Sequence, residues 1–213
     1  YTQGKEGIKD IFRPMLNWKV HSKWWFFAFF FASAIAYITL ILKTLYLSND
    51  FNAFELSFMH VTDPLFMINT ILFALVGEVV WVSYAVRKLS TSLNLFYASQ
   101  ITGLVWGLWW FPIVWFNVGV IPDLPLLPLI INMMGAAGMC AFVYAKTKSG
   151  LVVWLLQIML NTSGVIFPVS PTTGGIPTYT AFSLIYFIIM LAFMLYLKSS
   201  KKSLKYKHNI SNI

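Results

Sequence analysis

The sequence has few charged residues, only 10% of its 213 positions, whereas 59% are hydrophobic. A soluble domain usually has about a quarter of its residues charged and about half apolar. This shortage of charge excludes a water-soluble fold, a disordered chain and a coiled coil. The single cysteine, Cys140, has no partner within the chain, so a secreted disulfide scaffold is excluded as well.

Acidic residues are also few, and the chain carries a formal net charge of +8. Nucleic-acid binding needs a basic face in water, whereas here lysine and arginine stand where the hydrophobic runs stop. We therefore expect no nucleic-acid partner and interpret the charge as a topology signal. The sequence has no paired histidine or cysteine spacing, phosphate-binding loop or nucleotide fingerprint, so we expect neither a metal nor a cofactor.

Long hydrophobic runs predict an all-α, polytopic membrane protein with about six transmembrane helices. Each run is long enough, or nearly so, to cross about 30 Å of hydrocarbon at ~1.5 Å per residue. The fifth run is short and carries polar residues, so we expect it to lie against other helices. The predicted spans are residues 24–47, 64–86, 93–116, 124–145, 150–167 and 179–197.

The distribution of basic residues predicts that both termini are cytoplasmic. Every lysine and arginine except Lys43 falls in the leading segment, in the loops after the second and fourth spans, or in the tail. The alternate loops carry only acidic charges, from Asp50, Glu55, Asp63 and Asp123. The positive-inside rule and an even number of spans both favour this orientation, so we expect an integral protein of the cell membrane embedded in a lipid bilayer.

Three regions are expected along the chain. They are a cytoplasmic leader over 1–23, a six-span domain over 24–197 and a polybasic cytoplasmic tail over 198–213. In the leader, the apolar residues of KEGIKDIFRPMLN recur at helical spacing, which suits a short amphipathic helix on the membrane surface; the alternative is a solvated leader. These apolar residues are Ile8, Ile11, Phe12 and Met15.

Polar residues within spans are the first candidates for function. Glu78 is the only ionisable residue placed deep in a span, where a carboxyl without a cation partner is expected to be protonated. One interpretation is a neutral acid that bonds to a neighbouring helix, and the other is a functional group. Gln157 and Asn161 are four residues apart, so we expect them on one helix face with partners inside the bundle.

The third span carries a stripe of small residues. Ser99, Gly103 and Gly107 recur at four-residue spacing, which allows close contact with another helix. Trp106 and Trp110, also four apart, lie on a companion face. We interpret this pattern as packing, with a ligand slot as the alternative.

Three segments share their order and spacing with a known set of motifs: GEVVWVSYAVRKL at 77–89, LVWGLWWFPIVWF at 104–116 and YAKTKSGLVVWLLQIMLNTSG at 144–164. They resemble the motifs of the CPBP family of intramembrane proteases, which includes the CAAX prenyl endopeptidases and bacteriocin self-immunity proteins. The family forms are close to EExxWRGYLLxxL, LIWGLWHLPLF, and a T-x-S/G segment before a helix with HxxxN. The resemblance covers about 23–164 and implies the helical fold of that family.

The resemblance assigns the family's first motif to three residues of this chain. The first glutamate, which resembles a general base that activates water, corresponds to Gly77. The second glutamate is kept as Glu78, and the arginine four residues beyond corresponds to Val82. Base and arginine are therefore both replaced.

The later motifs depart from the family in the same way. The resemblance places the second-motif histidine at Trp110 and the last histidine at Gln157, while the asparagine is kept as Asn161. We therefore assign a catalytic role to no residue of this degenerate site, which comprises Gly77, Glu78, Val82, Trp106, Trp110, Gln157 and Asn161.

These replacements favour a catalytically inactive protein that serves as a scaffold or regulatory subunit for another membrane protein or complex. The aromatic run WWFFAFFF in the first span suits such a partner. Two alternatives stay open. One is a divergent endopeptidase that uses Glu78 with Asn161, and the other is a transport subunit in which Glu78 exchanges a proton or cation.

Overall fold

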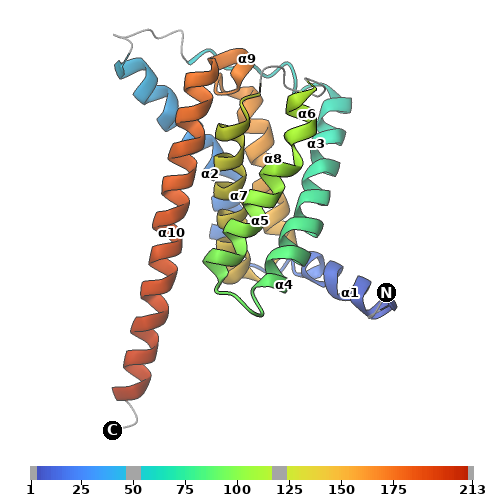
Figure 1. Ribbon diagram of the computed structural model, residues 1–213, viewed down its shortest axis with the longest axis vertical. Helices are drawn as coiled ribbons and strands as arrows, with labels where there is room; N and C mark the ends of the chain where they lie inside the picture. Colours follow the sequence, from blue (N-terminus) through green and yellow to red (C-terminus); the bar gives the residue numbers. More distant parts are fainter. Residues whose placement is uncertain (1–3, 47–53, 117–123, 211–213) are drawn as a thin grey trace.

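The computed structural model describes residues 4–46, 54–116 and 124–210, with side chains described as far as residue 199. Within these ranges every regular element is a helix, so the predicted all-α class is confirmed (Figure 1). The first half contains α1 (Gly4–Phe12), the 3-10 helix η1 (Arg13–Leu16), α2 (Ser22–Tyr46), α3 (Pro64–Gly77), the π-helix η3 (Glu78–Val86) and α4 (Arg87–Leu89). The second half contains α5 (Leu95–Trp109), α6 (Phe111–Trp115), α7 (Leu126–Thr147), α8 (Gly150–Ile166), α9 (Pro171–Gly174) and α10 (Ile176–Ile210).

Among the described residues, five helical segments are long and apolar enough to cross a membrane, which fits an integral membrane protein. They lie over five of the six predicted spans. The segments are Ser22–Tyr46, Pro64–Leu89, Leu126–Thr147, Gly150–Gly174 and Ile176–Ser199. The last helix continues beyond the predicted end of its span, as far as Ile210.

The remaining predicted span, 93–116, is divided between two shorter helices. α5 ends at Trp109, and α6 begins at Phe111 with Pro112 in its first turn. Proline lacks an N–H group and is tolerated only in the first turn of a helix, so the chain ends one helix and starts another at this point. Neither helix alone has the length of a span, because α5 has 15 residues and α6 has 5.

The helix α7 is the centre of the bundle. It packs against α5, α10, α8 and η3. Much of its buried surface consists of small residues, which let neighbouring backbones approach closely. These residues are Gly135, Ala136, Ala137, Gly138 and Ala141.

The predicted small-residue stripe of the third span forms the contact between α5 and α7. Ser99, Gly103 and Gly107 are all buried. A Cβ atom at Gly103 would lie 2.5 Å from the Cα of Met134, and one at Gly107 would lie 2.8 Å from the Cα of Ile130. Because these neighbours are backbone atoms, the two helices approach this closely only with glycine at both positions.

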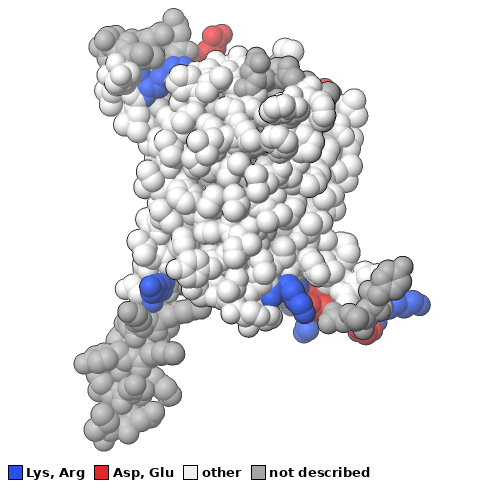
Figure 2. All heavy atoms as spheres, viewed as in Figure 1, with Lys and Arg blue, Asp and Glu red and all other residues white. Residues whose placement is uncertain are grey.

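Charged side chains gather at the two ends of the bundle, and an uncharged belt separates them on the face shown in Figure 2. The start of α1 and the end of α10 lie at the same end (Figure 1). We call this the basic end, because Arg13, Arg87 and Lys148 line one cavity there. The arrangement agrees with the charge pattern of the sequence, and the assignment of this end to the cytoplasm stays a prediction.

The leader forms the predicted short helix, which is continued by η1. Ile8 and Phe12 are exposed, 61% and 47% respectively, whereas Ile11 is partly buried, so the described protein covers the apolar face of α1 only in part. Beyond η1, the Asn17 side chain donates a hydrogen bond to the carbonyl of Thr147 at 3.1 Å, and the Ser149 hydroxyl donates to the carbonyl of Asn17 at 2.6 Å. These bonds hold the leader against the turn between α7 and α8.

We predict that Gly103→Ala destabilises the protein by about 1–3 kcal/mol, because the added methyl group meets helix backbone and overpacks the contact. The measurement is the free energy of unfolding in mixed micelles under SDS titration, followed by tryptophan fluorescence. Gly164→Ala is the matched control, since a Cβ atom there meets nothing within 4 Å in α8. An equal loss of stability in both variants would contradict the close α5–α7 contact.

Candidate functional site

Glu78 lies at the junction between two kinds of helix. It is the first residue of the π-helix η3, which follows α3 without a break. The side chain is 0% exposed, so the expectation of a buried carboxyl within a span is confirmed. π-Helical turns are rare in proteins, and many of them lie at functional sites, so this junction is a candidate functional site.

The carboxyl group of Glu78 has one partner among the described residues. The Ser83 hydroxyl donates to Oε1 at 2.6 Å, whereas Oε2 is buried without a hydrogen bond. The expectation of a bond to a neighbouring helix is wrong, because Ser83 belongs to the same helix. In a π-helix the backbone hydrogen bonds join residues five apart in the chain, and this register brings residues 78 and 83 onto one face.

The leader and α8 enclose the carboxyl group. A Cβ atom at Gly150 would lie 2.9 Å from Oε1 of Glu78 and 2.6 Å from the Sδ atom of Met15. Gly150 is the first residue of α8, and Met15 belongs to η1. Glycine at this position therefore leaves room for both the acid and the leader.

Gly77 lies directly against the side chain of Gln157. A Cβ atom at Gly77 would overlap Oε1 of Gln157 and would lie 3.4 Å from the ring of Trp106. Gln157 is 4% exposed, and its Nε2 atom has no hydrogen-bond partner among the described residues. The structure thus brings together the residues that the sequence predicted at Gly77, Glu78, Trp106 and Gln157.

Three further predicted residues have different environments. Val82 is fully buried in η3 and packs in the hydrophobic core. Trp110 follows α5, and its Nε1 atom is buried without a partner in the described structure. Asn161 is exposed, so the expectation that it shares a buried face with Gln157 is wrong. It lies one turn farther along α8, where Leu160, Thr162 and Ser163 are buried but Asn161 is not, and no hydrogen bond of its side chain is found within the described ranges.

Aromatic side chains fill the space beside the glycine. Trp106 of α5 stacks on Trp81 of η3, with ring centroids 5.8 Å apart. Trp154 of α8 donates its indole N–H to the carbonyl of Ile71 in α3 at 3.0 Å. The helices around Glu78 are therefore joined by indole contacts.

Ser83 is the residue that the sequence analysis missed. Its partnership with Glu78 needs a five-residue spacing, which an α-helical pattern does not place on one face. Only a π-helical register would have revealed it. Among the residues that the structure describes, no group of three or more His, Cys, Asp or Glu side chains could hold a metal ion.

The region that contains these residues is similar to one family of known proteins. Residues 61–163 match the family model described as type II CAAX prenyl endopeptidase Rce1-like. The match supports the fold expected from the three motifs, and it includes every residue of the degenerate site. No curated protein matches the chain.

We predict that Ser83→Ala destabilises the protein by about 1–3 kcal/mol, because it leaves Oε1 of Glu78 buried without a donor. The measurement is the free energy of unfolding under SDS titration. Ser183→Ala is the matched control, since Ser183 is equally buried but donates only to the carbonyl of Tyr179 within its own helix. A loss for Ser83→Ala no larger than for Ser183→Ala would contradict the proposed importance of this bond.

We also predict that Gly77→Ala destabilises the protein, and that Gln157→Ala relieves part of this effect. The reason is that the new methyl group and the Gln157 amide compete for one space. In a double-mutant cycle of unfolding free energies, residues in such contact show a coupling of about 0.5–3 kcal/mol. Strictly additive effects would show that Gln157 does not fill the space beside Gly77.

Proposed function

Because the chain has the fold of the CAAX-type intramembrane proteases, we propose that it is a catalytically inactive protein of that fold. Its role is that of a scaffold or regulatory subunit for another membrane protein. The single observation that carries this proposal is the complete burial of Glu78, whose side chain is 0% exposed.

Hydrolysis of a peptide needs a general base in contact with a water molecule. Oε1 of Glu78 already accepts the Ser83 hydroxyl and lies close to Gly150 and the leader. The one carboxyl kept at the site is thus engaged in packing and hydrogen bonding within the protein. This supports a structural role for Glu78.

The position of the family's general base also favours inactivity. The resemblance assigns that base to Gly77, where the Gln157 amide takes the space that a side chain would need. Trp110, at the position of a family histidine, has an indole N–H that donates but cannot accept a proton. The described residues of the site therefore include no general base that has space beside it for a water molecule.

The two alternative functions are less well supported by the geometry. A divergent protease would need Glu78 and Asn161 to face one water molecule, whereas Glu78 is buried and Asn161 is exposed. A proton- or cation-coupled transport subunit would need a hydrated path to Glu78. The zero exposure of its side chain argues against such a path.

The scaffold role is favoured by an aromatic surface on α2. Phe26, Phe29 and Phe30 are all exposed, and the rings of Phe26 and Phe30 stack with centroids 6.4 Å apart. Aromatic residues at exposed helix surfaces suit both lipid anchoring and contact with a partner. Another membrane protein that packs on this surface is the partner we propose.

We predict that the purified full chain, reconstituted in liposomes, cleaves neither a farnesylated CAAX peptide nor a transmembrane peptide reporter. The reason is that Glu78 has no access to water. The measurement is product formation by mass spectrometry, with an active CAAX endopeptidase in the same liposomes as the positive control. In cells that lack the native copy, Glu78→Gln is expected to restore the biological role as well as the wild-type chain does.

One outcome would overturn this proposal. It is cleavage by the wild-type chain that Glu78→Gln abolishes while the variant still folds, as judged by its unfolding transition. That result would make Glu78 a catalytic residue. Ser183→Ala, which changes a buried serine of α10 away from the site, is the matched control for nonspecific loss of activity.

A further inference from the structure

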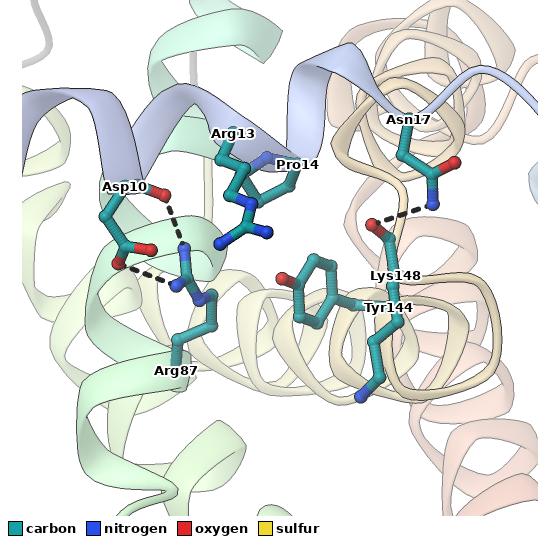
Figure 3. Close-up of a pocket in the computed structure, with 7 residues that line it drawn as sticks. All are labelled: Asp10, Arg13, Pro14, Asn17, Arg87, Tyr144 and Lys148. Atoms are coloured by element: carbon teal, nitrogen blue, oxygen red, sulfur yellow. Dashed lines mark hydrogen bonds and ion pairs between the residues drawn. The ribbon is translucent and has the colours of Figure 1, made fainter.

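A cavity of about 340 Å³ lies at the basic end, between the leader, the start of α4 and the end of α7 (Figure 3). It is separate from the degenerate site, and none of the residues assigned to that site lines it. The residues that carry the argument below are Asp10, Arg13, Asn17, Arg87, Tyr144 and Lys148.

Positive charge exceeds negative charge in this cavity, because three cations and one carboxylate line it. Arg87 is paired with Asp10, donating to its carboxylate at 2.8 Å and to its carbonyl at 2.9 Å. For Arg13, no ion pair or hydrogen bond of the side chain is found within the described ranges. The charge of Arg13 is thus available to an anion.

The donors converge from different elements. In Figure 3 the guanidinium of Arg13 points into the space between Arg87 and Tyr144, and the hydroxyl of Tyr144 faces the same space. The ammonium of Lys148 lies over the Tyr144 ring, 5.6 Å from its centroid. Two guanidinium groups and a phenol therefore surround one space, while the ammonium of Lys148 points away from it in Figure 3.

Hydrogen bonds hold the two sides of the cavity together. The side chain of Asn17 donates to the carbonyls of Thr147 and Lys148, at 3.1 and 3.2 Å. These bonds attach the end of the leader to the end of α7, while the Asp10–Arg87 pair attaches α1 to the start of α4. These contacts fix the backbone on both sides of the cavity and the position of the Arg87 guanidinium.

The surroundings of the cavity suit a membrane surface. Phe12 and Leu16, on either side of Arg13, are exposed by 47% and 79%. Apolar side chains on a surface helix enter the boundary between headgroups and acyl chains. An anion that reaches Arg13 beside these side chains is therefore at the level of the lipid phosphates.

We propose that this cavity binds a phosphate group through Arg13 and Arg87, and that an anionic phospholipid supplies it. Guanidinium groups bind phosphate through two parallel hydrogen bonds, and basic pockets between transmembrane helices bind lipid headgroups. The lipid phosphate then lies under the leader while its acyl chains run beside the exposed apolar residues.

The test uses the full chain in nanodiscs of equal phosphatidylcholine and phosphatidylglycerol, with retained lipid measured by native mass spectrometry. The wild-type chain is expected to retain phosphatidylglycerol, and Arg13→Gln is expected to retain about tenfold less, as for the loss of a charge-assisted hydrogen bond. Lys88→Gln is the matched control, because it removes one exposed cation next to Arg87 that does not line the cavity. In a second arm, inorganic phosphate is added to phosphatidylcholine nanodiscs and thermal unfolding is followed.

The arms separate the possible outcomes. Loss of phosphatidylglycerol in Arg13→Gln but not in Lys88→Gln supports the proposal. Stabilisation of the wild type alone by inorganic phosphate, without lipid retention, overturns the lipid as the source of the phosphate. Equal retention of phosphatidylglycerol in all three proteins, or an equal loss of it in both variants, overturns the proposed phosphate site at Arg13. Since no bond of the Arg13 side chain is found in the described structure, the variant is expected to fold, which its unfolding transition checks.

Discussion

Close approach of helix backbones is the constraint on which this bundle depends. In a bilayer, an apolar side chain gains little by leaving lipid for protein, so helices associate through packing and hydrogen bonds. α7 meets this requirement with small residues, and α5 brings Gly103 and Gly107 against it. The same principle operates at Gly77, where the absence of a side chain lets Gln157 of α8 lie against the helix that carries Glu78. The absence of a side chain therefore explains both the close contact of α5 with α7 and the position of Gln157 beside Gly77.

Polar groups in such a bundle must find partners inside the protein. Some of them join helices: the Trp154 indole bonds to the carbonyl of Ile71, and the hydroxyls of Ser33 and Ser163 lie 2.9 Å apart. Glu78 meets the requirement for one oxygen within its own helix, because the π-helical register brings Ser83 to Oε1, whereas Oε2 has no partner among the described residues. This local bond lets a carboxyl remain buried without a cation in contact with it. A preserved glutamate is thus compatible with a structural role as well as a catalytic one.

The sequence predicted much of the fold, because hydropathy and charge are properties of whole segments. The positions of five spans, the short helix of the leader and the stripe of Ser99, Gly103 and Gly107 were all visible in this way. The break at Trp110 was missed, although Pro112 marks it, since an average over a long apolar run conceals one proline.

The site was less predictable, because it depends on register and burial. Of the motif positions, Gly77 and Gln157 lie in contact, whereas the role of the predicted site stays a prediction. Helical spacing wrongly placed Asn161 on a buried face. Leu160, Thr162 and Ser163 are buried at the same level, so burial there depends on the directions from which other helices pack, which a four-residue spacing does not state. Ser83 could not be found from α-helical spacing at all, because its bond to Glu78 exists only in a π-helix.

The leader connects the degenerate site with the cationic cavity. Met15 lies beside Gly150 and the Glu78 carboxyl, whereas Arg13, two residues earlier, faces the cavity at the basic end. Both residues belong to η1, which Asn17 and Ser149 attach to the turn between α7 and α8. The same short helix therefore packs against the buried acid on one side and carries the Arg13 cation of the cavity on the other, so the position of the leader sets the geometry of both places.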